Sequence, residues 1–286
     1  MAVSVLTSVP LQRLCLEGWR SLWNTVHLRR ILSLCSSTLE ELAFEGCHIS
    51  DHGTAPTPVT STAPQDVHME ALRRLRLSYA ESCLLEMPHI ELPNLESPFC
   101  EHTRNHIDYI APWVPATATE LTLKVSGDST PPRFSPAIRL CSLTIDICPT
   151  RRTSLYPSVV SWIGHCIDGL PCTDDLRHLN IHIMNTPRIW LSEPCYPARA
   201  DYESLYDTLR PLHQGGALKH LDLTMEVNAS EIVSDRIVYP VYRTRAEVAT
   251  VKEVWGLVTE RADVVVELTF KLTTSTRELV VLKYCL

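Results

Sequence analysis

The stretch LEELAFEGCHISD, from Leu39 to Asp51, decides the fold of this chain. Leu42 and Phe44 alternate with other residues, which predicts a short strand with one apolar face, because successive side chains of a strand point to opposite faces. Leu39 stands three residues before Leu42, so it belongs to the bend that leads into the strand. The polar ending at Ser50 and Asp51 predicts that the chain then continues into a loop.

The same spacing, L-x-x-L-x-L, recurs along the chain. Between the matches, apolar residues at helical spacing predict helices within 22–35, 159–170, 202–209 and 248–258. The pattern is weakest in residues 87–115, where Leu92 and Leu95 are followed by Ser97 and Pro98 instead of a third apolar residue. The central positions of the matches are Leu14, Leu42, Leu75, Leu121, Leu143, Leu179, Leu221 and Leu268, with gaps of 22 to 47 residues.

This irregular spacing is compatible with two architectures. One is a divergent array of strand-and-helix units with inserted loops, and the other is an ordinary parallel α/β protein whose buried strands contain leucine. A doubly wound nucleotide-binding enzyme should carry a glycine-rich turn between a strand and a helix. The nine glycines form neither G-x-G-x-x-G nor G-x-x-x-x-G-K. Because the same L-x-x-L-x-L spacing recurs along the chain, we favour the array of strand-and-helix units.

Residues 39–51 closely resemble the cysteine-containing leucine-rich repeats of F-box proteins, the substrate receptors of ubiquitin ligases, down to the Cys-x-Ile-Ser-Asp ending. Cys47 occupies the position where such a repeat carries Asn or Cys. The resemblance implies a single irregular α/β solenoid, or horseshoe, over residues 1–286, with a parallel sheet on the concave face and helices on the convex face. We expect proline-containing loop excursions near residues 53–66 and 186–200.

By this resemblance, the chain is similar to the substrate-recognition part of an F-box ubiquitin-ligase receptor. No F-box is visible, and the first repeat starts only ten residues from Met1, so we expect an upstream segment that supplies an N-terminal cap or the F-box. A ubiquitin-ligase adaptor is an expected partner only if that F-box exists. The alternatives are a free-standing leucine-rich-repeat scaffold or inhibitor, and an α/β hydrolase or transferase with a degenerate motif.

Composition argues against several functional classes. The 26 basic and 33 acidic residues give a net charge of −7, so we expect no nucleic-acid partner. The chain has neither an export signal nor a run of about 18 apolar residues, so we expect no membrane partner. We therefore expect a cytoplasmic or nuclear protein whose eleven cysteines are mostly reduced.

One segment, FCEHTRNHID, contains the most metal-like cluster, which consists of Cys100, His102, His106 and Asp108. His102 and His106 would share one face of a helix, but the spacing matches no strong zinc pattern, so we expect a polar surface loop without metal or cofactor. Cys166 lies in a helical apolar stripe, which explains its thiol as a core residue. Because the chain has no G-x-S-x-G motif, we expect a non-catalytic protein.

The polar residues of each match should point outward and line up across neighbouring strands. Their mixed charge suits a protein or peptide target better than a small apolar ligand, although any solvated face would also be polar. If the histidines of this face adjoin, partner binding should weaken below pH ~6.5 as they gain charge. The predicted partner-binding residues are Glu41, Glu45, Arg74, Arg76, Glu120, Lys124, Asp146, His178, Asn180, His182, His220, Asp222 and Lys271.

Overall fold

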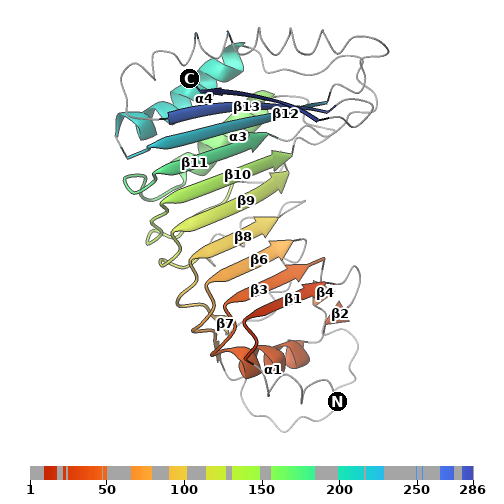
Figure 1. Cartoon of the computed structure of the whole chain (residues 1–286). Coiled ribbons are helices and arrows are strands. Elements are labelled where there is room, and N and C mark those ends of the chain that lie inside the picture. The colour runs from red at the N-terminus through yellow and green to blue at the C-terminus, as the bar shows by residue number, and fades with distance from the viewer. Residues whose placement is uncertain are drawn as a thin grey trace.

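The structure is a computed structural model of the whole chain (Figure 1). It describes residues 10–17, 22–23, 25–46, 48–49, 66–78, 90–101, 114–126, 131–148, 156–183, 199–215, 217–228, 249, 253, 265–273 and 279–285. Within these ranges, no helix has both the length and the apolar character that crossing a membrane requires.

One ten-stranded sheet runs through the molecule, and its strands lie side by side in their order along the chain (Figure 1). The first nine are parallel, so the chain must return to the same end of the sheet after each of them. The last strand is antiparallel to its neighbour. The strands are β1 (Arg13–Glu17), β3 (Glu41–Glu45), β6 (Arg74–Ser78), β8 (Ser97–Glu101), β9 (Glu120–Ser126), β10 (Ser142–Cys148), β11 (His178–Ile183), β12 (His220–Asn228), β13 (Val265–Thr273) and β14 (Leu279–Cys285).

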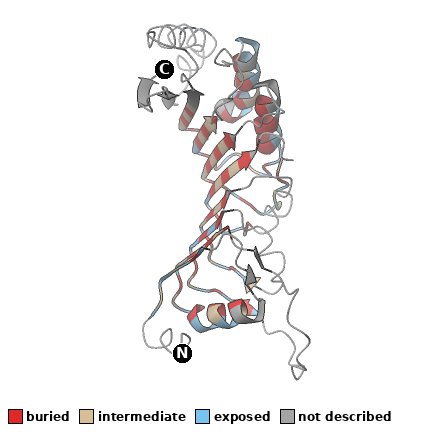
Figure 2. Cartoon of the chain, turned by 90° about the vertical axis from the view of Figure 1, so that its right-hand side faces the viewer, coloured by how far each residue is buried: buried red, intermediate tan, exposed pale blue. Residues whose placement is uncertain are grey.

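The described helices bury the apolar stripes that the sequence predicts. In α1 (Thr25–Cys35), Leu28 and Leu32 are fully buried. The same holds for Ile163 and Cys166 in α3 (Tyr156–Asp168), and α4 (Arg199–Gln214) buries Tyr202. Figure 2 shows α3 and α4 together on one side of the sheet. The sheet is therefore covered by helices on that side, as in other α/β proteins.

A single hydrophobic core lies between the sheet and these helices. Leu42 and Leu143 point into it from the strands and are 3% and 0% exposed, and they belong to the same cluster as the buried residues of α1 and α3. Alternate residues of each strand enter this core, so the predicted inward-facing ladder is confirmed for the strands with described side chains. Burying one leucine contributes about 1.5 to 3 kcal/mol, which makes this ladder the main source of stability.

The same hydrogen bonds recur at the start of each strand. The carbonyl oxygen of Gln12 accepts bonds from the main-chain N–H groups of Glu40 and Glu41, at 2.8 and 3.0 Å. Each accepting residue directly precedes a strand, and its two donors are the residue before the next strand and the first residue of that strand, which fixes the register between neighbours. The other residues that accept in this way are Glu40, Arg73, Glu96, Thr119, Cys141 and Arg177.

The segment with the weakest pattern forms a regular strand, β8, and the predicted alignment there was wrong by three residues. Leu95, not Leu92, takes the first apolar position, since Glu96 accepts the strand-starting bonds. Pro98 and Cys100 then take the two inward positions, and they pair with Leu75 and Leu77 of β6. A proline and a cysteine at leucine positions concealed the repeat.

The last parallel strand lies two residues out of the predicted register. Leu221 pairs with Val266, so Val266 takes the central leucine position of the repeat in β13. Leu268, which was predicted there, pairs with Leu223 instead. The segment has a continuous apolar alternation, which permits either alignment from sequence alone. The next strand, β14, pairs antiparallel with β13.

Other boundaries differ from the prediction in smaller ways. Helix α4 begins at Arg199, so the second expected loop is shorter at this end and Asp201 lies inside the helix. Residues 184–198 of this loop and residues 50–65 of the first one lie outside the described residues, as does Cys47. Two short pairings were not predicted: β2 (Leu22–Trp23) with β4 (His48–Ile49), and β5 (Val67–His68) with β7 (Ile90–Glu91).

Candidate functional site

The strand register aligns the outward-pointing side chains into rows that cross the sheet. We call the face opposite the core, which these rows form, the open face. In the first row, Arg13, Glu41 and Arg74 are direct neighbours, and in the third row Glu17 lies beside Glu45. Further along the first row, Ser142 lies between Glu120 and His178. The open face therefore brings together residues that are 20 to 40 positions apart in the sequence.

Ion pairs join the first three strands on the open face. The Nε atom of Arg13 lies 3.0 Å from Oε2 of Glu41, whose other oxygen pairs with Arg74. In the next register positions, Nε of Arg76 lies 3.4 Å from Oε1 of Glu45. We call these five residues the arginine–glutamate patch. Because its positive and negative charges alternate across the strands, the patch is close to neutral and can pair with a partner of either sign at short range.

Phe99 of β8 extends this patch, and the sequence prediction did not include it. The Arg76 guanidinium carbon lies 4.8 Å from the centre of the Phe99 ring, which is cation–π geometry. Beside it, the Ser97 hydroxyl donates to Oε2 of Glu120 at 3.0 Å. The 23-residue spacing from Leu72 to Leu95 and from Leu95 to Ala118 was the signal that could have identified this strand. An aromatic ring on a polar face is the residue type that most often contributes to protein interfaces.

A second group, which we call the histidine patch, lies on β10, β11 and β12. Its members are Asp146, His178, His182 and His220. The Nδ1 atom of His182 lies 3.4 Å from Oδ1 of Asp146, with both side chains about one-fifth exposed. The rings of His178 and His220 have their centres 5.9 Å apart. His178 and His220 are thus direct neighbours, whereas His182 lies further along β11, between Asp146 and Thr224.

Hydrogen bonds between side chains connect the rest of this region. Asn180, in the middle of β11, donates to the Thr144 hydroxyl at 3.1 Å. The Thr224 hydroxyl donates to Oδ1 of Asp222 at 3.2 Å. These contacts hold polar side chains in place without covering them, since all four residues remain partly exposed. Lys124 occupies the register position next to Asp146.

Lys271 lies at a different place from the one predicted. It pairs with Glu226, one step beyond the row that contains Thr224 and Thr269. The cause is the two-residue register shift of β13, which puts Glu267 beside Asp222. The remaining predicted residues lie in the expected rows of the open face.

The exposed thiol of Cys15 lies beside two carboxylates. Its Sγ atom is 3.7 Å from Oε1 of Glu17, and one donor atom each of Cys15, Glu17 and Glu45 fall within 4.8 Å of one another. Burial raises the pKa of this thiol, and the charges of Glu45 and Glu17 raise it further. The thiol therefore stays protonated at neutral pH and can donate to the Glu17 carboxylate.

The metal-like cluster of the sequence is only partly described. Cys100 is 3% exposed and points into the core from β8, so its thiol is a packing group. His102, His106 and Asp108 lie outside the described residues. Cys166 is also a core residue, as the helical stripe predicted, and burial raises its pKa to about 12.

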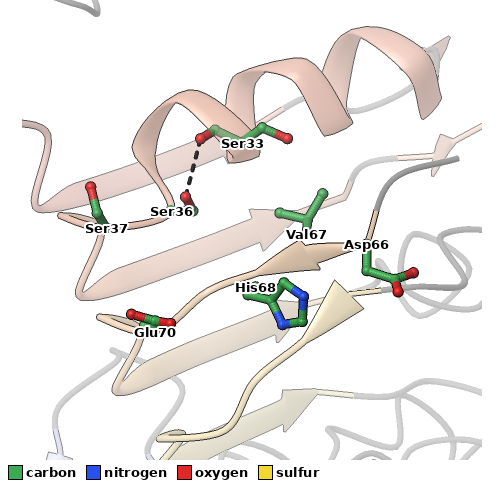
Figure 3. A pocket seen from close by; sticks show the side chains of 7 residues that line it. All are labelled: Ser33, Ser36, Ser37, Asp66, Val67, His68 and Glu70. Carbon is green, nitrogen blue, oxygen red and sulfur yellow. Dashed lines mark hydrogen bonds between the residues drawn. The ribbon is translucent and has the colours of Figure 1, made fainter.

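A pocket of about 380 Å³ opens between the end of α1 and β5 (Figure 3). Its lining residues are Ser33, Ser36, Ser37, Asp66, Val67, His68 and Glu70. Nδ1 of His68 lies 2.8 Å from Oε2 of Glu91, and the Ser36 hydroxyl donates to the Ser33 carbonyl oxygen at 3.1 Å. In the part of the chain that the structure describes, no hydrogen bond joins His68 to a serine. The imidazole and the hydroxyls are therefore not arranged as a nucleophile and its base.

Comparisons with protein-family models, with curated proteins and with solved structures find no match to this chain.

Proposed function

We propose that this chain is a leucine-rich-repeat-like solenoid that acts as a non-catalytic protein-interaction module and binds its target on the open face. The observation that carries this proposal is the unbroken register across the nine parallel strands, which builds rows of polar side chains from short, separate segments. The other face of the sheet packs on the hydrophobic core, so the rows are the part of the sheet that a partner can reach.

The recurring bonds at the strand starts support the solenoid part of the proposal. Eight successive strands, from β1 to β12, are linked by seven such carbonyl groups, each of which accepts two N–H groups, so each unit meets its neighbour in the same way. Unit length is most regular in the middle of the chain, where Leu72, Leu95, Ala118 and Leu140 start successive turns at intervals of 22 or 23 residues. Such nearest-neighbour repetition is the defining feature of solenoids.

The size of the open face supports a macromolecular partner. Neighbouring strands are about 4.8 Å apart, so the nine parallel strands extend over roughly 40 Å. A surface of this length with alternating charge suits a folded protein or a peptide, whereas small ligands occupy enclosed and mostly apolar pockets. Phe99 and Arg76 lie where the arginine–glutamate patch meets β8 and are the expected anchors, since aromatic and arginine side chains contribute most at interfaces.

More specifically, we propose that the chain functions like the substrate-recognition part of an F-box ubiquitin-ligase receptor. The resemblance of residues 39–51 supports this assignment. Gly46 follows β3 with a φ of 62° and donates its N–H to the Ser78 carbonyl oxygen at 2.7 Å, so the chain turns directly after the strand at the start of the Gly-Cys-His-Ile segment. A ligase adaptor then binds only through an F-box segment upstream of these repeats.

The test exchanges the two charges of one ion pair on the open face. Glu45→Arg with Arg76→Glu keeps a pair at these positions but reverses its direction. The matched control is Asp207→Arg with Arg210→Asp, which exchanges an exposed ion pair on α4. Each chain is used for affinity capture in cells that express the protein, and a photo-reactive residue at Thr122 or, as its control, Ser204 maps the contact.

A target that is captured by the wild type and the control exchange, lost with the open-face exchange, and cross-linked from Thr122 supports the proposal. Ubiquitin-ligase components in the same capture support the receptor form, and a target without them supports a free-standing binder. A target that depends equally on both exchanges, or that cross-links only from Ser204, contradicts the open face as the binding surface.

A further inference from the structure

The strand β1 forms one edge of the ten-stranded sheet (Figure 1). In a parallel pairing, alternate residues direct both main-chain groups to the same neighbour. Gln12 bonds β3 through its carbonyl oxygen, so Leu14 and Leu16 also face β3. Arg13, Cys15 and Glu17 consequently direct their main-chain N–H and C=O groups away from the sheet. No hydrogen bond to these groups occurs in the described part of the chain.

Unpaired edge groups of this kind readily accept another strand. Natural edges are often blocked by a proline, a bulge or charged side chains. The strand β1, with the sequence RLCLE, has no proline and no inward-pointing charge, and its two outward charges are of opposite sign. Its two leucines point toward the core, and Leu14 is only partly buried because no further strand covers it. The side chains of Arg13, Cys15 and Glu17 are exposed on the open face.

The sequence of β1 is complementary to itself when reversed. Reading RLCLE against its own reverse places Arg13 opposite Glu17, Leu14 opposite Leu16 and Cys15 opposite Cys15. Opposite residues in an antiparallel pair share one face, so both charge pairs would lie on the open face and the leucines on the core side. The main-chain groups also fit this pairing. The residues whose N–H and C=O groups point away from the sheet are the ones that would form the hydrogen-bonded pairs of the antiparallel arrangement.

We propose that β1 binds β1 of a second copy of this chain, as an antiparallel pair with its two-fold axis at Cys15. Arg13 then pairs with Glu17 of the partner subunit, and Glu17 with the partner subunit's Arg13. Three hydrogen-bonded residue pairs supply about six main-chain hydrogen bonds. The two sheets join into one, and their cores become continuous at Leu14 and Leu16. This interface has the isologous symmetry that most homodimers use.

A further observation at this edge favours a second copy as the occupant. Helix α1 lies next to β1 in Figure 1, and its Leu34 is 43% exposed, which makes it the exposed large apolar side chain of the described residues. A dimer formed at β1 brings the two α1 helices near each other and offers this side chain a contact.

The proposal concerns association through the edge strand β1 and does not rest on the proposed function, although Arg13 also belongs to the arginine–glutamate patch. Its test is sedimentation velocity of the full-length chain over a wide concentration range, with the wild type, Arg13→Glu, Glu17→Arg and the double variant. Each single variant places like charges opposite each other twice and should weaken the dimer about tenfold or more. The double variant restores opposite charges and should dimerise like the wild type.

Mixing gives the most specific readout. The two single variants together form opposite-charge pairs only with each other, so the mixture should dimerise while each alone does not. Arg210→Glu on α4 is the control for a change of charge, and thermal unfolding checks that each variant folds. A wild type that stays monomeric, single variants that dimerise normally, or a mixture that does not associate would each overturn the proposal.

Discussion

Cys100 pairs with Leu77 across β6 and β8, and the two residues are 23 positions apart in the chain. On its other side, Cys100 pairs with Leu123, again 23 positions away. Two successive units of equal length therefore occupy equivalent places in the sheet. This equivalence means that one unit can replace the next without changing the register.

Deletion of residues 95–117 tests this equivalence. It removes one unit and brings Ala118 to the place of Leu95, so the N–H groups of Thr119 and Glu120 meet the carbonyl of Arg73 in place of that of Glu96. We expect the shortened chain to unfold cooperatively. Its β-sheet circular-dichroism signal should fall by the contribution of one strand. Deletion of residues 95–106 removes about half a unit and is the control, which should not fold. Equal behaviour of the two deletions would contradict a repeating architecture.

Leu42 tests the inward-facing ladder. Its side chain is 3% exposed, and Leu42→Ala should lower the free energy of unfolding by about 2 to 5 kcal/mol because it leaves a cavity. Leu42→Asp should prevent folding locally or globally, since it buries an unpaired carboxylate. Ala43→Asp, on the open face of the same strand, is the control and should have little effect on denaturant unfolding. Unchanged stability of Leu42→Asp would exclude an inward position.

The contact between Arg76 and Phe99 should couple two strands only weakly. A double-mutant cycle with Arg76→Gln and Phe99→Leu should give a coupling energy of about 0.5 to 1 kcal/mol in urea unfolding, because the contact is partly exposed. In target binding, each single substitution should cost more than in folding if these residues are anchors. Loss of stability without loss of binding would make the contact purely structural.

Burial of the Cys166 thiol predicts that the protein loses stability at alkaline pH. Its pKa is raised from 9.0 in the unfolded chain to about 12 by burial, so the folded state holds the proton that the unfolded state loses. The stabilising contribution is complete below pH 9 and is lost as the pH rises from 9 toward 12, with a slope of up to about 1.4 kcal/mol per pH unit. Urea unfolding of the wild type and of Cys166→Ala at pH 8 and pH 9.8 should show the steeper decline in the wild type. Parallel declines would contradict the buried thiol as the cause.

Leucine spacing located most strands because a buried strand in this fold needs large apolar residues at alternate positions. It failed at β8, where Pro98 and Cys100 fill the same positions, and at β13, whose valines and leucines fit two registers. The two-residue strands were beyond prediction, since their pairing depends on neighbouring units and not on local pattern. The rows of the open face followed from the strand positions, but the particular contacts, such as Arg76 with Phe99, required the true register.

The reversed direction of β14 gives the two ends of the molecule different chemistry. Its hydrogen bonds to β13 alternate between close and wide pairs, whereas every earlier pairing uses evenly spaced, slanted bonds. A further strand beside β14 that kept the direction of the nine parallel strands would pair with β14 in the antiparallel pattern and not in the slanted one. The two edges of the described sheet, β1 and β14, therefore present different arrangements of main-chain donors and acceptors.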